Sequence, residues 1–338
     1  MTIAVQFADF EHLRALADTL PVFDDDSANA ARARQNSLTK PPGSLGRLED
    51  LAVFLAGWRR TDRPKIDVAQ SLVFAGNHGI CDQGVNPFPQ AITGLMVENF
   101  ERGGAAINQL ADLAGAKLTV VPLDLDTPTQ DFTKAPAMTT EECLGAMRKG
   151  AESVDPNADI LILGEMGIGN STVSAALAQG IFGGDAADWV GRGTGSDEDG
   201  MALKRKVVAE GVERHRGLGP LEILAALGGR EQAAICGAVL AARASSIPVI
   251  LDGYICSAAV APLHGMNPTL LAHCLVGHAS AEPGHAMLCD AMGKPPILNL
   301  GMALGEGTGA ALALNVIRGA LACHNGMATF EEAGIAAG

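Results

Sequence analysis

The chain has 338 residues and a formal net charge of −14, with 48% hydrophobic and 4% aromatic side chains. This composition argues against nucleic-acid partners, which need clustered Lys and Arg for phosphates and aromatic platforms for single strands. No apolar run reaches the roughly 18 residues of a membrane helix, and the N-terminus lacks a basic segment before an apolar one. The seven cysteines never occur as Cys-x-x-Cys, so we expect free thiols in a soluble, cytoplasmic enzyme.

The first 65 residues are predicted to be mostly helical. Apolar residues recur at helical spacing over three segments, at residues 10–20, 29–38 and 45–58. Prolines at positions 41 and 42 end one helix, and Ser44 can cap the next. Because the pattern predicts no strand before about residue 70, we expect residues 1–65 to form a helical lobe or an arm that packs on another subunit.

From about residue 70, short apolar runs alternate with helices. Strands are predicted at residues 70–75, 117–123, 159–163, 248–251 and 270–276. Helices are predicted at residues 91–114, 141–153, 173–179, 199–215, 230–244, 253–261 and 282–292. Strands that are apolar throughout and alternate with helices indicate an α/β fold with a parallel, Rossmann-like sheet covered on both faces. We assign residues 66–322 to this catalytic domain.

The loop at residues 164–172 offers glycines, backbone amides and a Ser/Thr cap at a helix start, which suits a phosphate. It is not a Walker loop, and its two glycines at 167 and 169 are a weak dinucleotide fingerprint. Within the loop, Glu165 suggests contact with a cationic or N–H-bearing ligand. Alternatively, Glu165 only accepts hydrogen bonds from backbone amides.

A second glycine-rich turn spans residues 191–195 and carries a hydroxyl at Thr194. Downstream, Lys204, Arg205 and Lys206 supply dense positive charge, so a phosphate could lie between the turn and one of the lysines. The alternative is a solvated helix face. Further on, His278, Glu282 and His285 have helical offsets, but Pro283 and Gly284 interrupt a regular helix. We therefore predict no metal site.

Residues 298–315 run from an apolar stretch through a glycine-rich turn into an Ala/Leu-rich helix. Glu306 lies between Gly305 and Gly307, which let the backbone approach a ligand closely. A carboxylate among apolar side chains has a raised pKa and can exchange protons near neutrality. Glu306 is therefore a candidate general base, and the alternative is a capping glutamate at a helix start.

Five segments together resemble one family, the nicotinate-nucleotide–dimethylbenzimidazole phosphoribosyltransferases of cobalamin assembly. They are residues 40–49 (KPPGSLGRLE), 77–79 (NHG), 164–170 (GEMGIGN), 251–254 (LDGY) and 304–311 (LGEGTGAA). Each segment alone is weak evidence, but the ordered set spans most of the chain and is specific. The resemblance implies a parallel α/β sheet with a small helical lobe built from N- and C-terminal pieces, so that residues 323–338 pack with the lobe. It also implies a homodimer without a cofactor.

The resemblance further implies a reaction. A benzimidazole nitrogen attacks C1′ of nicotinate mononucleotide, and nicotinate leaves to give α-ribazole 5′-phosphate. Glu306 matches the family's general base, and Glu165 matches a glutamate that orients the benzimidazole or stabilises charge. The residues implied to hold the phosphate and ribose are Gly167, Asn170, Gly193, Thr194, Gly195, Lys206 and Ser280. Those implied for the benzimidazole pocket are Phe88, Met96 and Leu304.

Other readings of the same residues stay open at this point. A hydrolase could use the same carboxylate to cleave nicotinate mononucleotide with water. A non-catalytic nucleotide sensor could share the fold, although it would not need both Glu165 and Glu306. A NAD-dependent dehydrogenase is disfavoured, because no strand–GxGxxG–helix unit opens the chain.

Overall fold

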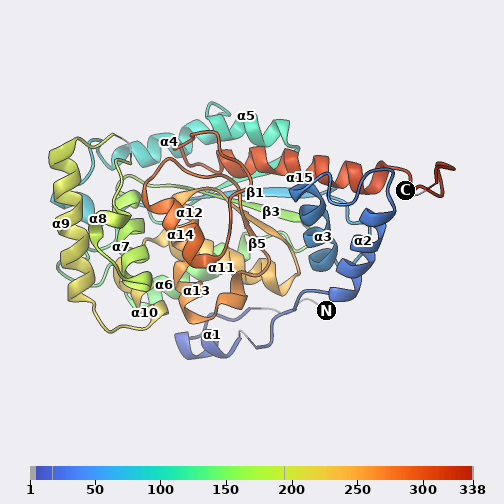
Figure 1. The fold of residues 1–338 in the computed structure, drawn as a ribbon. Helices are drawn as coiled ribbons and strands as arrows, with labels where there is room; N and C mark the ends of the chain where they lie inside the picture. The colour runs from blue at the N-terminus through green and yellow to red at the C-terminus, as the bar shows by residue number, and fades with distance from the viewer. Residues whose placement is uncertain (1–4, 17, 194, 337–338) are drawn as a thin grey trace.

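The computed structural model describes residues 5–16, 18–193 and 195–336 (Figure 1). At its centre lies a five-stranded sheet in the order β2-β1-β3-β4-β5, with every neighbouring pair parallel. The strands are β1 (Ala69–Ala75), β2 (Ala116–Pro122), β3 (Ile160–Met166), β4 (Val249–Leu251) and β5 (Cys274–Val276). The predicted parallel α/β sheet is confirmed.

The two faces of the sheet carry separate hydrophobic cores, because successive strand residues point to opposite faces. Leu72 and Phe74 of β1 belong to one core, and Val73 between them belongs to the other. The second core is covered by α3 (Arg47–Arg59), α4 (Ala91–Glu101), α5 (Ala106–Leu113) and α15 (Thr308–Gly326). The first is covered by α1 (Phe10–Leu16), α6 (Thr140–Glu152), α7 (Asn170–Phe182), α8 (Ala186–Trp189), α9 (Glu198–Arg214), α10 (Pro220–Leu227), α11 (Arg230–Ala244), α12 (Tyr254–Ala259), α13 (Ala261–Met266) and α14 (Gly284–Met292).

N- and C-terminal segments lie side by side at the right of Figure 1, where α2 (Asp25–Ser37) and α3 meet the end of α15. Arg34 donates hydrogen bonds to the carbonyls of His324 and Met327, and Leu38 forms a bridge with Thr329. In contrast, α1 packs on the first core of the α/β body. Since α15 continues to Gly326, it crosses the proposed boundary at residue 322, and the division into three segments stays a prediction.

Several predicted elements have different limits in the structure. The helix predicted at residues 91–114 is two helices, because Gly103 adopts φ +77° in the turn between α4 and α5. The strand predicted at residues 270–276 begins only at Cys274. Before it, residues 268–271 form the short 3₁₀ helix η2 (Pro268–Leu271), which Asn267 caps by accepting a hydrogen bond from the Thr269 amide. A second 3₁₀ helix, η1 (Gly79–Gln83), follows β1.

The short or apolar helices α8, α10 and α13 were not predicted. In the described part of the chain, no helix is both long and apolar enough to cross a membrane.

Candidate active site

A cavity opens beyond the carboxyl ends of β3 and β4. In the observed strand order the chain changes direction between β1 and β3, so the cavity lies beside this switch point, and parallel sheets bind ligands beyond the carboxyl ends of their strands. The wall is formed by residues 165–171, 252–255 and 303–305 together with Asn86, Gly193, Lys204, His278, Ser280 and Glu282. The glycine-rich loops that follow separate strands therefore meet at one edge, as the sequence predicted.

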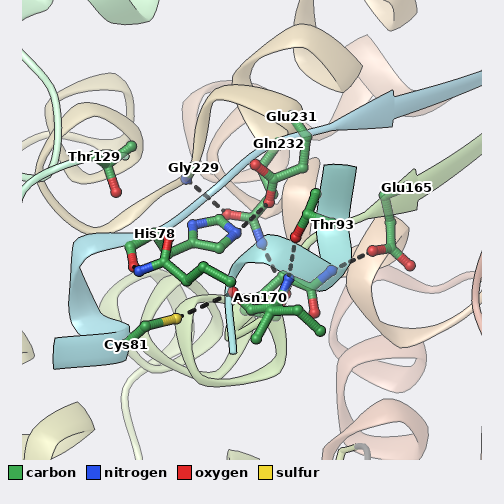
Figure 2. Close-up of polar contacts among 12 residues, drawn as sticks. His78, Cys81, Thr93, Thr129, Glu165, Asn170, Gly229, Glu231 and Gln232 are labelled. Atoms are coloured by element: carbon green, nitrogen blue, oxygen red, sulfur yellow. Dashed lines mark hydrogen bonds and ion pairs between the residues drawn. The ribbon is translucent and has the colours of Figure 1, made fainter. Parts of the chain in front are cut away.

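Glu165 lies at the end of β3, on the cavity wall. The sequence placed it in the following loop, but β3 continues to Met166 because Glu165 still pairs in register with Phe74 of β1. Its side chain is buried and accepts a hydrogen bond from the Asn170 amide at the start of α7 (Figure 2). Burial, followed by the carboxylates of Asp252 and Glu231, raises the pKa of Glu165 well above 4.5.

Glu306 lies in the turn before α15, with φ +65° in the left-handed region that is costly for a residue other than glycine. Its backbone passes over Gly164 of β3, where a Cβ would overlap the Glu306 carbonyl. Burial raises the pKa of Glu306, Asp252 adds to the rise, and the Ile107 amide opposes it. Its Oε2 has no hydrogen-bond partner among the described residues. The neighbouring Gly305 lines the cavity, but Glu306 itself is not among the lining residues.

Asp252 connects β4 to the turn that carries Glu306. Its carboxylate accepts hydrogen bonds from the backbone amides of Gly307 (3.2 Å) and Ala310 (2.9 Å), at the start of α15. An anionic oxygen at a helix N-terminus is favoured by the free amides and the helix dipole. Asp252 was not predicted as a site residue, although its place directly after a buried strand was a usable signal.

One end of the cavity is suited to an anion. The loop at residues 167–170 leads into α7, and Lys204 of α9 lies beside it, with Nζ 3.3 Å from the Ser171 hydroxyl and 3.3 Å from the Gly191 carbonyl. Gly193 has φ +53°, and a Cβ there would lie 2.6 Å from the Ser171 hydroxyl. Burial lowers the pKa of Lys204, and Glu282 opposes this change. An anion site is therefore formed by the start of α7, the glycine turn at Gly193 and the ammonium of Lys204.

Two predicted phosphate residues are not part of this arrangement. Lys206 has a side chain that is 69% exposed, and its Nζ lies 3.8 Å from Glu210 on the same helix. Residues two apart on an α-helix point about 200° apart, so Lys204 faces the cavity while Lys206 faces solvent, and the role predicted for Lys206 stays a prediction. Gly195 is exposed and outside the cavity wall. Thr194 lies outside the described residues.

The segment at residues 278–285 forms another part of the wall. Ser280 lines the cavity, and its backbone amide donates to Nδ1 of His285 at 2.8 Å. The other ring nitrogen of His285 lies 3.2 Å from the Ser257 hydroxyl. Burial, with a contribution from His278, lowers the pKa of His285 to about 4. Glu282 accepts a hydrogen bond from the Gly193 amide, so this segment also holds the glycine turn.

The predicted benzimidazole residues are only partly brought together. Leu304 lines the cavity and is 58% exposed, so it offers an apolar surface at the opening. Phe88 is exposed and does not line the wall, but its carbonyl accepts a hydrogen bond from Asn86, which does. Met96 lies on α4 and packs against the second core.

Comparisons with known proteins agree with this arrangement. A family model described as phosphoribosyltransferase matches residues 20–335. The chain is 62% identical to the nicotinate-nucleotide–dimethylbenzimidazole phosphoribosyltransferase of Rhodobacter capsulatus, over 98% of this chain and 100% of that protein. It is 56% identical to the protein of that name from Ruegeria pomeroyi, over 98% of each. The crystal structure of CobT from Thermus thermophilus superposes with a TM-score of 0.88 at 40% identity, covering 93% of this chain and all of the other.

Proposed function

The chain belongs to the phosphoribosyltransferase family, and we propose that it transfers the phosphoribosyl group of nicotinate mononucleotide to 5,6-dimethylbenzimidazole. The shape of the cavity supports this proposal independently of the relatives. A single cavity joins an anion end at Lys204 to a carboxylate end at Glu165, with Leu304 beside the carboxylate end at the adjacent Gly305. The anion end suits the 5′-phosphate, and the apolar surface of Leu304 suits the flat benzimidazole.

The reaction exchanges one base for another at C1′ of the ribose. A benzimidazole nitrogen forms the new bond to C1′ as the bond to nicotinate breaks, and the bonding electrons leave with the pyridine ring. Because the pyridinium is a good leaving group, nicotinate needs little acid catalysis. The second benzimidazole nitrogen loses its proton, and a carboxylate with a raised pKa suits that task.

We assign this proton to Glu306. The support is its burial, its raised pKa and an Oε2 without a partner among the described residues. Glu165 lines the cavity wall, where a charged form would stabilise the positive charge that develops on the ribose. Its hydrogen bond from Asn170 couples this carboxylate to the start of α7, at the anion end of the cavity.

We also propose that the enzyme is a cytoplasmic homodimer. Leu304 and Phe88 expose apolar surface at or beside the cavity opening, which a second copy of the chain would cover. Sedimentation of the purified protein measures the oligomeric state directly.

The test of the function is nicotinate release from nicotinate mononucleotide, measured with and without 5,6-dimethylbenzimidazole. Release that depends on the benzimidazole and yields a ribosylated base establishes the transferase. Release without any acceptor would instead identify a hydrolase. Nucleotide binding without release under any condition would identify a non-catalytic nucleotide-binding protein.

A further inference from the structure

The side chains of His78 and Glu231 form a buried polar contact next to the cavity but outside its wall. Both side chains are fully buried, and Nε2 of His78 lies 3.1 Å from Oε1 of Glu231 (Figure 2). His78 follows β1, and Glu231 is the second residue of α11, where the helix N-terminus favours a carboxylate. The two residues are 153 positions apart in the chain, and the reaction proposed above assigns neither a role.

Three glycines make room for this pair. A Cβ at Gly76 would overlap the Glu231 carboxylate, and a Cβ at Gly229 would overlap the His78 ring. A Cβ at Gly167 would lie 2.9 Å from Nε2 of His78. Gly76 follows β1, Gly167 follows β3 and Gly229 precedes α11. The pair therefore fills the junction at which three separate loops meet.

The two side chains depend on each other for a polar partner. Apart from their mutual contact, the ring nitrogens of His78 and the carboxylate oxygens of Glu231 have no hydrogen-bond partner among the described residues. Both side chains are buried, so removing one member leaves the other without its partner, which is far more costly than replacing both members. The position of the His78 ring is thus determined by Glu231.

The His78 ring in turn contacts the anion end of the cavity. It packs against the backbone at Gly167, the first residue of the loop that leads into α7 and lines the cavity. From α4, the Thr93 hydroxyl accepts a hydrogen bond from the next amide, that of Ile168 (Figure 2). His78 and Thr93 therefore support this loop from two different elements.

We propose that His78 and Glu231 act as one positioning pair that holds the loop at residues 167–170 in the conformation that binds the nucleotide phosphate. The inference rests on the proposed function, because it takes the phosphate of nicotinate mononucleotide as the ligand of this loop. Its effect is on binding of the nucleotide. Binding of the benzimidazole, whose pocket is assigned to Leu304, does not depend on the pair.

The test compares His78→Gln, Glu231→Gln and the double variant, with His273→Gln as a matched control. His273 is also a fully buried histidine, and its Nε2 bonds the Val239 carbonyl away from the cavity. We expect each single variant to raise the KM for nicotinate mononucleotide about tenfold with little change in kcat, as loss of uniform binding does. The KM for the benzimidazole stays the same. In the double variant two neutral amides can bond each other, so its nucleotide KM returns to within about threefold of wild type.

A nucleotide KM that is unchanged in folded single variants, as in His273→Gln, would overturn the proposal. So would a double variant whose KM equals the product of the two single effects, because the residues would then act independently. If a single variant does not fold, the variant Gly229→Ala decides, since the atoms nearest to its Cβ belong to His78 and Glu231. Gly319→Ala, where a Cβ meets nothing within 4 Å, is its control.

Calorimetric binding of nicotinate mononucleotide separates this inference from the proposed function. If the wild-type protein binds the nucleotide but transfers nothing, the proposed transferase function is wrong. The positioning role of the pair can still be tested, because the affinity of the variants for nicotinate mononucleotide is measured separately. If transfer proceeds and the affinity is unchanged in Gly229→Ala, the function stands and the pair has no positioning role.

Discussion

The carboxylate of Asp252 accepts a hydrogen bond at 3.2 Å from the backbone amide of Gly307, the residue directly after Glu306. A strand end thereby determines where the proposed base lies, although the base itself belongs to a turn 54 positions later in the chain. Because Glu306 adopts a strained left-handed conformation, its turn needs such an external support.

We expect Asp252→Ala to lower both stability and turnover. The variant leaves the Gly307 and Ala310 amides without their acceptor in a buried position, which costs about 1–3 kcal/mol per group. Turnover falls because the turn with Glu306 is released. Asp24→Ala is the matched control: Asp24 caps α2 by accepting from the Ser27 amide, and its loss lowers stability at a site away from the cavity. Urea unfolding and steady-state kinetics measure both effects. A kcat that survives in Asp252→Ala as it does in Asp24→Ala would contradict the prediction.

We expect Glu306→Gln to lower kcat by about 100-fold or more, with nucleotide binding retained, because a positioned base contributes that much. In the wild type the base must be deprotonated. Since burial raises the pKa of Glu306, kcat falls as the pH drops through a value above 4.5, and the variant lacks this acidic limb. Glu165→Gln is measured in parallel and should keep the limb. If Glu165→Gln loses the limb and Glu306→Gln keeps it, the base is Glu165.

The two neighbouring lysines of α9 offer a matched pair of variants. Lys204→Ala removes a buried ammonium from the anion end of the cavity, so we expect the KM for nicotinate mononucleotide to rise about tenfold or more. Lys206→Ala removes an exposed side chain that faces Glu210, and its KM should stay within about twofold of wild type. Equal effects of the two variants would show that the phosphate is not held at Lys204.

We expect His285 to make the folded protein less stable in acid. Its Nδ1 accepts the Ser280 amide and must be unprotonated, and its folded-state pKa is about 4 instead of 6.5. Between these values the unfolded chain binds a proton that the folded chain does not. The free energy of unfolding therefore falls as the pH is lowered from 6.5 to 4, by up to about 3 kcal/mol from this group.

The measurement is urea unfolding at pH 7, 5.5 and 4.5 for the wild type and His285→Asn. The Asn carbonyl can still accept the Ser280 amide but does not titrate, so the variant should lose less stability over this range. Parallel pH dependences in the two proteins would exclude His285 as the cause.

Local sequence patterns were sufficient to predict many strands, turns and loops of this protein. The apolar runs of β1 and β3, the glycines that flank Glu306 and the loop at residues 164–170 were all identified from residues that are neighbours in the chain. Such features depend on side-chain periodicity and on backbone freedom at glycine, both of which are written into a short segment. They were enough to predict a parallel α/β sheet with its loops at one edge.

Tertiary structure decided how these segments meet. The pairing of β3 with β1 extends the strand through Glu165, and the orientation of α9 turns Lys204 inward and Lys206 outward. The contact of Asp252 with Gly307 and that of His78 with Glu231 join distant segments. No local period encodes these contacts, because they depend on how the helices and strands pack around the two cores and on what space the glycines leave between them.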